Sequence, residues 1–169
     1  MKFILAFLVL SSVGTSAWGM GQKPIDIKPG KVNYSAFPGE YVLIKSSGNV
    51  KQFCDAYKSL RIVASPSRGL VEAVGVDQYA MFHYEKINNN RDDFDSCWND
   101  GMKGYSEIVG NGSVVVNRTI HLKKGFLCTG KGESCRKGGF FAIDKEGRLN
   151  VGWDDRCYKQ SALCVYERR

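Results

Sequence analysis

The stretch from Cys128 to Glu167 constrains the fold of this chain more than any other. It holds four of the six cysteines, and two short apolar runs lie between them, at 139–143 and 148–153. The four cysteines are Cys128, Cys135, Cys157 and Cys164. Asp144 and Gly147 bound the connection between the runs, which is typical of a hairpin because Asp starts turns and Gly accepts a positive φ. The stretch predicts a β-rich block tied by disulfides.

The N-terminus has the pattern of a secretory signal peptide. Lys2 provides the positive charge, residues 3–13 are apolar, and small residues follow at Ala17 and Gly19. This apolar run is too short and wrongly flanked for a spanning helix. We therefore expect residues 1–19 to be a signal, cut near Ala17 or Gly19, and the mature chain to be secreted.

The remaining chain of about 150 residues has the length of one domain. Residues 20–39 contain Pro24, Pro29 and Pro38 and no hydrophobic period, so they predict an extended arm. Residues 40–169 predict a single domain without internal repeat or linker.

Six cysteines behind a signal indicate an oxidising compartment and three disulfides, for which fifteen pairings exist. The two outside the C-terminal stretch are Cys54 and Cys97. A zinc site is the alternative, but no C-x-x-C occurs and both histidines are distant from the cysteines. Three sequons predict exposed N-glycosylation sites in a eukaryotic secretory pathway, at Asn33, Asn111 and Asn117.

Hydrophobic periodicity predicts an α+β domain, dominated by an antiparallel sheet with one or two helices. Apolar residues at steps of three and four predict a helix over 49–60, which carries Cys54, and a second, weaker helix is expected over 67–74. Residues 88–101 are expected to form a loop. The expected strands are 40–45, 61–64, 78–87, 105–109, 113–122, 139–143, 148–153 and 162–167.

The chain is basic, with 24 Lys and Arg against 17 Asp and Glu, a net charge of +7 and a pI near 9.1. This charge favours an acidic protein or glycan partner, although a dispersed charge also serves solubility alone. The densest basic clusters are pairs, Lys123-Lys124 and Arg136-Lys137, so nucleic acid is not the expected partner. We expect a monomer without a membrane span.

One candidate catalytic set consists of His83, Glu85, Arg118 and His121. Two imidazoles, a carboxylate and a guanidinium could serve acid–base cleavage of RNA, with arginine steadying the phosphate. The hairpin FFAIDKEGRLNVGW is faintly similar to the late strands of microbial guanyl-specific ribonucleases, which use such a set. Their second catalytic histidine follows that strand, whereas no histidine follows His121 in this chain.

The C-terminal third resembles C-type lectin-like domains, through Cys135, the hairpin, Trp153-Asp154-Asp155, Cys157 and Cys164. The predicted helix around Cys54 is similar to the family's first helix, and Trp98-Asn99-Asp100-Gly101 to its middle segment. No proline follows Pro66, so the calcium-dependent sugar site of the family is not implied. The acidic residues Asp92, Asp93 and Asp95 suggest calcium, but they lack the Gly and Glu of an EF-hand loop.

The resemblance implies that Cys54 pairs with Cys164 and Cys135 with Cys157, which leaves Cys97 for Cys128. A local scheme would join Cys128 to Cys135 and Cys157 to Cys164, and leave Cys54 for Cys97. The sequence favours the first scheme slightly, because the predicted helix with Cys54 must dock on the sheet and Cys164 lies in the last strand. Loop-closure entropy does not choose between them, since native geometry decides whether a bridge forms.

No G-x-S-x-G motif, metal set or cofactor loop occurs in the sequence. The prediction is a secreted, effector-like binding protein without enzymatic activity, metal or cofactor. The alternatives are a lectin-like module without the calcium-dependent sugar site, and a secreted ribonuclease-like protein.

Overall fold

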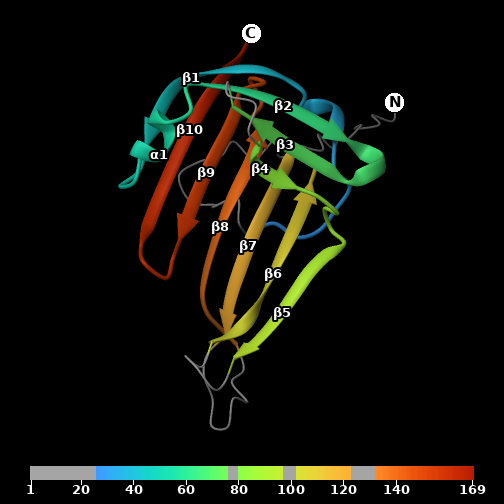
Figure 1. The fold of residues 1–169 in the computed structure, drawn as a ribbon, viewed down its shortest axis with the longest axis vertical. Helices are drawn as coiled ribbons and strands as arrows, with labels where there is room; N and C mark the ends of the chain where they lie inside the picture. The colour runs from blue at the N-terminus through green and yellow to red at the C-terminus, as the bar shows by residue number, and fades with distance from the viewer. Residues whose placement is uncertain (1–25, 76–79, 97–101, 123–131) are drawn as a thin grey trace, which may run out of the picture.

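The computed structural model describes residues 26–75, 80–96, 102–122 and 132–169. These residues form one antiparallel sheet of ten strands in the order β4-β3-β2-β1-β10-β9-β8-β7-β6-β5. The strands are β1 (Gly39–Ser47), β2 (Ser59–Ser65), β3 (Leu70–Val74), β4 (Ala80–Tyr84), β5 (Asn90–Ser96), β6 (Met102–Asn111), β7 (Val114–Leu122), β8 (Glu133–Ile143), β9 (Leu149–Asp155) and β10 (Gln160–Arg168). The sheet curls on itself, with β1–β4 across its upper end and β5–β8 reaching to its lower end (Figure 1).

The predicted α+β class is wrong, because the described helical segments are single turns: η2 (Tyr34–Ala36), α1 (Gln52–Asp55) and η3 (Pro66–Arg68). The helix expected over 49–60 shrinks to α1. The helical spacing holds for one turn, because the rings of Phe53 and Tyr57 contact each other, with a centroid distance of 5.8 Å, and both pack on the core. Leu60, however, is buried as a residue of strand β2, in which side chains alternate between the two faces.

The helix expected over 67–74 is also wrong, because this segment is a turn followed by β3. Gly69 takes a φ of +59° and ends η3 after one turn. Val71 and Ala73 then enter the core from one face of β3. Periodicity over so short an apolar segment does not separate a helix from a buried strand.

The loop expected over 88–101 contains a strand, β5, which pairs with β6 from Asn90↔Ile108 to Ser96↔Met102. The sequence NRDDFDS has the charges of an exposed edge strand, and such strands have no clear hydrophobic alternation. The hairpin turns were predicted correctly. Gly112 and Gly147 have φ values of +56° and +76°, and a carboxylate oxygen of Asp144 accepts hydrogen bonds from two backbone amides of its turn.

The arm before β1 begins on the outer face of the sheet, and its last part, with Phe37, enters the inner core. Ile27 packs against Val114 and Val116 of β7, and Val32 bridges to Gly112. The predicted signal, 1–19, lies outside the described residues. No helix among the described residues is long and apolar enough to cross a membrane.

The upper half of the inner face is a closed aromatic core. Phe82 and Tyr84 of β4 contact the ring of Phe141 on β8, with centroid distances of 5.5 and 5.0 Å. Since β4 is an edge strand far from β8 in the sheet order, side chains close the curled sheet here. Phe37, Tyr41 and other large side chains fill the same cluster.

Two disulfides are present among the described residues, Cys54–Cys164 and Cys135–Cys157. They are two of the bonds that the lectin-like resemblance implied, and they exclude both local bridges within the C-terminal stretch. The first joins α1 to β10, as the docking argument expected. Cys97 and Cys128 lie outside the described residues. Disulfides are typical of an oxidising compartment. The resemblance itself stays a prediction.

Candidate ligand site on the inner face of the sheet

The two faces of the lower sheet follow from the alternation along β7. Val115 belongs to the closed core, so Asn117, Thr119 and His121 share its inner face, whereas Val116 faces outward. Val115 is fully buried and Asn117 is exposed. The inner face therefore changes from apolar and closed to polar and accessible within two residues.

Cross-strand pairs share a face, and they assign further residues to this region. Thr119 pairs with Ser106 and with Lys137, and Gly139 pairs with Asn117 and Trp153. We call the set the lower inner face. Its members are Asp92, Phe94, Ser106, Asn117, Thr119, His121, Lys137, Trp153 and Asp155.

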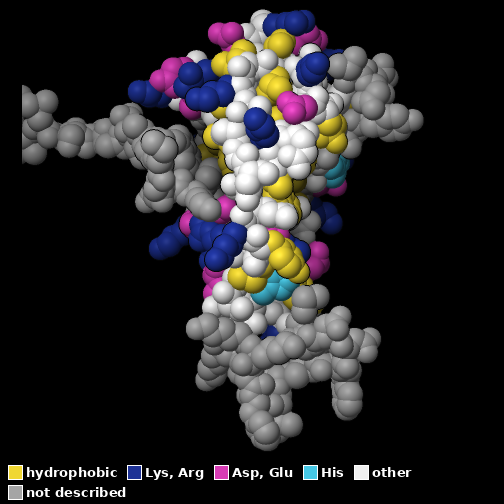
Figure 2. All heavy atoms as spheres, turned by 90° about the vertical axis from the view of Figure 1, so that its left-hand side faces the viewer, with side chains coloured by type: hydrophobic (Ala, Val, Ile, Leu, Met, Phe, Trp, Pro, Cys, Tyr) yellow, Lys and Arg dark blue, Asp and Glu magenta, His cyan; other side chains and the backbone are white. Residues whose placement is uncertain are grey.

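His121 contacts the ring of Phe94 edge to face, with a centroid distance of 5.8 Å. Partial burial lowers the pKa of His121, and the positive charge of Lys137 lowers this pKa further, while Asp155 acts in the opposite direction. The imidazole is therefore neutral at neutral pH, since the ordinary histidine pKa is about 6.5. In Figure 2 a histidine side chain lies beside hydrophobic side chains near the lower end of the molecule.

Lys137 is partly buried and forms no ion pair with a carboxylate of the described residues. Asp155 is its register partner on β9, but one oxygen of Asp155 accepts the backbone amides of Cys157 and Tyr158 at 2.9 and 3.0 Å. The lower inner face thus carries an ammonium group without a bonded counter-ion in the part of the chain that the structure describes.

Tyr84 marks the boundary between the closed core and the lower inner face. A Cβ on Gly139 would lie 2.9 Å from the Tyr84 hydroxyl, so any larger residue at this position would require the Tyr84 side chain to shift. Tyr84 is 3% exposed, and burial raises the pKa of its hydroxyl. Among the described residues, no hydrogen-bond partner for this hydroxyl is present.

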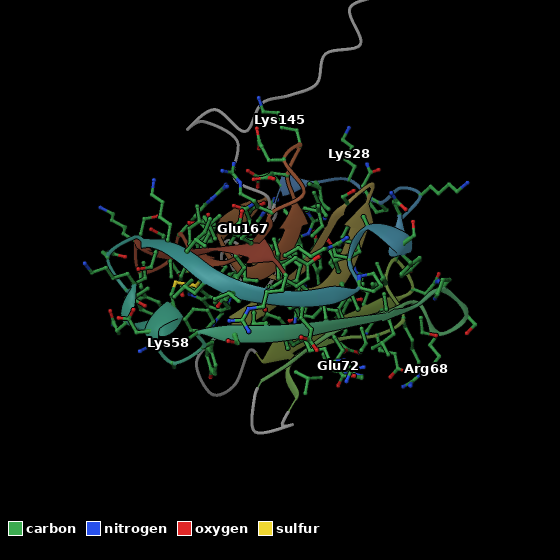
Figure 3. All side chains as sticks on the ribbon, turned by 90° about the horizontal axis from the view of Figure 1, so that it is seen from above. Lys28, Lys58, Arg68, Glu72, Lys145 and Glu167 are labelled. Atoms are coloured by element: carbon green, nitrogen blue, oxygen red, sulfur yellow. A yellow bond between two sulfur atoms is a disulfide. The ribbon has the colours of Figure 1, made fainter. Side chains whose placement is uncertain are left out.

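The predicted ribonuclease set is brought together only in part. Nε2 of His83 lies 3.4 Å from Glu85 and its Nδ1 lies 3.3 Å from Glu72, while Arg68 pairs with Glu85 at 2.8 Å. Hydrogen bonds from Arg68 and then His83 lower the pKa of Glu85. This cluster belongs to the outer face, since His83 and Glu72 pair across β3 and β4 opposite to the core residues (Figure 3).

Arg118 and His121 have other partners. Arg118 is 8% exposed on the outer face, where it pairs with Glu107 at 2.6 Å and donates to the carbonyl of Ile27 at 2.8 Å. It anchors the arm, on the side of β7 opposite to His121. Within the described ranges, no group of three or more His, Cys, Asp or Glu side chains is arranged to hold a metal.

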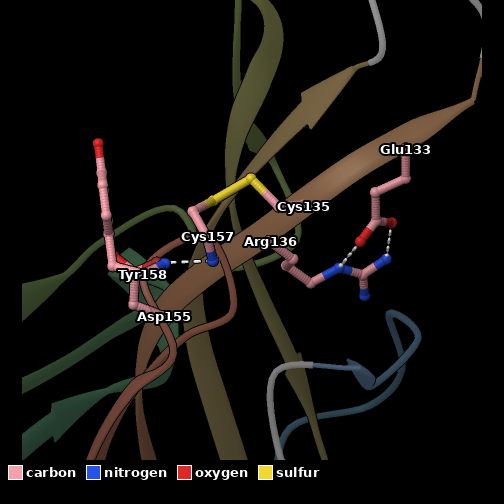
Figure 4. The surroundings of a disulfide bond; sticks show 6 residues. All are labelled: Glu133, Cys135, Arg136, Asp155, Cys157 and Tyr158. Carbon is pink, nitrogen blue, oxygen red and sulfur yellow. Dashed lines mark hydrogen bonds and ion pairs between the residues drawn. A yellow bond between two sulfur atoms is a disulfide. The ribbon is translucent and has the colours of Figure 1, made fainter.

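The disulfide Cys135–Cys157 lies beside the lower inner face, next to the turn between β9 and β10 (Figure 4). Arg136, its outward-facing neighbour, pairs with Glu133 and with Asp26 of the arm. The predicted glycosylation residues Asn33, Asn111 and Asn117 are all exposed. Asn117 is at the same time part of the lower inner face.

Sequence reasoning identified His121 but missed its neighbours. Lys137 lies on another strand, and only the register of β7 with β8 brings it beside His121. Phe94 was assigned to a loop. The available signal was the alternation of Asn117, Thr119 and His121 along one predicted strand, opposite in face to buried valine.

No protein-family model and no curated protein matches the sequence. Among solved structures, the chain is similar to the REP1-NXSQ fatty acid transporter, with a TM-score of 0.41 and 12% identity over 78% of this chain and 95% of that one. It is also similar to a point mutant of that transporter, with a TM-score of 0.43 and 12% identity over 78% of this chain and 97% of that one. Similarity this weak says nothing about the ligand of this chain.

Proposed function

We propose that this chain is a secreted, non-enzymatic binding protein that holds a small amphipathic anion at the lower inner face. The observation that carries the proposal is Lys137, a partly buried ammonium group without an ion pair among the described residues. It lies on the same face as the aromatic side chains Phe94 and Trp153.

The charge of Lys137 favours an anion. A partly desolvated charge is stabilised when it gains a charge-assisted hydrogen bond, and a carboxylate, sulfonate or phosphate provides one. The neutral imidazole of His121 adds a donor without competing for the anion.

The remaining side chains favour an apolar body for the ligand. Phe94 and Trp153 offer ring surface, and binding sites for small molecules combine such surface with a few polar groups. The hydroxyls of Ser106 and Thr119 bond to each other at 2.9 Å, so their hydrogen bonding is met within the protein. The Tyr84 hydroxyl, in contrast, is a donor without a partner among the described residues, at the upper boundary of the site.

The side chains of this face support binding more than catalysis. General acid–base catalysis requires a positioned pair of proton-transferring groups. On the lower inner face, no described carboxylate is hydrogen-bonded to His121 or to Lys137. The lectin-like and ribonuclease-like alternatives stay predictions, and an RNA cleavage assay with His83→Ala and His121→Ala tests the second.

Comparing dodecanoate with dodecanol distinguishes the contribution of the anionic group to binding from that of the apolar chain. We expect the purified protein to bind dodecanoate more tightly, with tryptophan fluorescence or calorimetry as the measurement. Lys137→Met should weaken dodecanoate binding about tenfold to a hundredfold, because a hydrogen bond to a charged group contributes about 1.5–3 kcal/mol. It should leave dodecanol binding unchanged.

Lys145→Met is the matched control, because Lys145 lies at the exposed turn between β8 and β9 (Figure 3). Equal loss in both variants would contradict the role of Lys137. If the protein binds neither dodecanoate nor dodecanol, the proposed ligand class as a whole is contradicted.

A further inference from the structure

The turn between β9 and β10 exposes one aromatic side chain to an unusual degree. Tyr158 is 74% exposed, and among the described residues only Ile44, at 50%, is another large hydrophobic residue of this kind. Figure 4 shows the Tyr158 side chain extending away from the disulfide and from the strands. None of the contacts described above uses its ring or hydroxyl.

The backbone of this turn is fixed from within. Cys157 is bonded to Cys135 of β8, and an oxygen of Asp155 accepts the amides of Cys157 and Tyr158. The amide of Arg156 donates to the carbonyl of Arg136 at 2.9 Å. Tyr158 is therefore presented by a preorganised turn, which reduces the entropic cost of binding through it.

Asn49 fixes the far side of the turn. Its Nδ2 donates to the carbonyl of Lys159 at 2.9 Å, and its Oδ1 accepts the amide of Ser161 at 2.7 Å. The amide of Val50 donates to the carbonyl of Ser161 at 3.1 Å. These bonds bring the segment that carries Lys51 beside the turn.

Two cations therefore lie near Tyr158. Lys51 and Lys159 are exposed and have no ion pair among the described residues. Arg156 differs from them, because it is paired with Asp26 at 2.6 Å and with Asp154 at 3.2 Å. The turn presents an exposed amphipathic ring, near two lysines that have no ion pair among the described residues.

We infer that this turn, with Tyr158, Lys159 and Lys51, is a contact surface for an anionic lipid bilayer. Tyrosine favours the boundary between apolar chains and water, and lysines are attracted to anionic headgroups. A protein partner fits less well, because the centre of a protein interface is a packed apolar patch from which lysine is depleted. A single projecting ring among lysines suits a soft, charged surface.

The surface adjoins the proposed ligand site but does not depend on it. Asp155, which fixes the turn, is the register partner of Lys137. Docking at Tyr158 would place the lower inner face close to the bilayer, where amphipathic anions partition. Bilayer contact and ligand binding can therefore be tested separately.

Vesicle co-sedimentation tests the inference, with mixed phosphatidylcholine–phosphatidylserine vesicles against pure phosphatidylcholine vesicles. We expect the protein to bind the mixed vesicles only at low ionic strength, or more tightly at low ionic strength than at high. Tyr158→Ser should bind these vesicles markedly less. Lys51→Gln and Lys159→Gln should each weaken binding about fivefold. Lys28→Gln, an exposed lysine of the arm, is the matched control and should have a smaller effect than either (Figure 3).

A Tyr158→Trp variant provides a second measurement, because its emission should shift to shorter wavelength when the ring enters the headgroup region. Unchanged binding by Tyr158→Ser, or equal binding to both kinds of vesicle, would overturn the inference. A third result would also overturn it: the protein binds polyglutamate, and Tyr158→Ser loses this binding but still binds vesicles. The surface would then serve an acidic polypeptide. Retained dodecanoate binding in Tyr158→Ser shows that the ligand site is intact in either case.

Discussion

The upper and lower halves of the inner face are built from the same strands but differ in what covers them. Val115 and Phe141 are fully buried beneath β4, whereas Asn117 and Lys137, farther down β7 and β8, are accessible. The alternation of side chains is the same in both halves. Phe82 and Tyr84 cover the upper half and make it a core, whereas no described aromatic contact of this kind closes the lower half.

The largest expected effect is on the upper half. Phe141→Ala removes a fully buried ring that contacts both Phe82 and Tyr84. We expect the free energy of unfolding to fall by about 3–5 kcal/mol, measured by urea denaturation. A loss below about 1 kcal/mol would show that the upper half of the inner face is not a closely packed core.

The two disulfides should also differ in how much they stabilise the fold, with the larger effect in the upper half. Removing Cys54–Cys164 should cost about 2–5 kcal/mol, and the chain-entropy model makes it about 1.4 kcal/mol more stabilising than Cys135–Cys157. The reason is that their sequence separations are 110 and 22 residues. Thermal or urea unfolding of the two double Cys→Ala variants compares them. The reverse order would mean that the lower half depends on its bridge more than the upper half does.

Binding of an anion at the lower half should strengthen as the pH falls. Lys137 from β8 and Asp155 from β9 are the charged groups that act on His121, and Phe94 of β5 is uncharged. The pKa of His121 is lowered in the free protein, and a bound anion would raise it, so the complex takes up a proton. Affinity therefore rises as the pH falls from about 6.5 through the lowered pKa, by up to about tenfold for each unit of pKa change.

Calorimetry with decanesulfonate, whose charge is constant over this range, measures the dependence. His121→Gln should remove it and keep most of the affinity at neutral pH. A pH dependence that persists in His121→Gln would assign the proton to another group.

A smaller effect is expected on His121 itself. Lys137→Met removes a positive charge that lowers the pKa of His121, so this pKa should rise. Proton NMR titration of the imidazole measures it, and Lys145→Met should leave it unchanged. An unaltered pKa of His121 in Lys137→Met would show that the two side chains do not lie close together in solution.

The local parts of the fold could be predicted from the sequence. The turns at Gly112 and Gly147 depend on a few adjacent residues, and most strands with clear alternation were placed within a few residues. The exception is β8, which was expected over 139–143 but begins at Glu133, so the half of it that carries Lys137 was missed. The helix over 49–60 could not be rejected, because Leu60 belongs to β2 only through its pairing with β1. β5 has the polar composition of a loop and is a strand because β6 pairs with it.

The candidate site was less predictable than the fold. His121 drew attention as a titratable residue, but the ribonuclease-like set combined it with residues of the outer face. Its actual neighbours come from β5 and β8, and a shift of one residue in either register would reverse the faces. Long-range pairing determines the site, and the sequence carries little information about that pairing.

The most direct test of ligand binding at the lower inner face is to locate the ligand on the sheet. Amide chemical-shift changes on addition of dodecanoate should concentrate at Gly104, Thr119, Lys137 and Gly139, with little change at Val151 in the upper core or at Glu72 on the outer face. Changes confined to β2–β4 around His83 and Glu72, or spread through the upper core, would contradict the assignment of binding to the lower inner face.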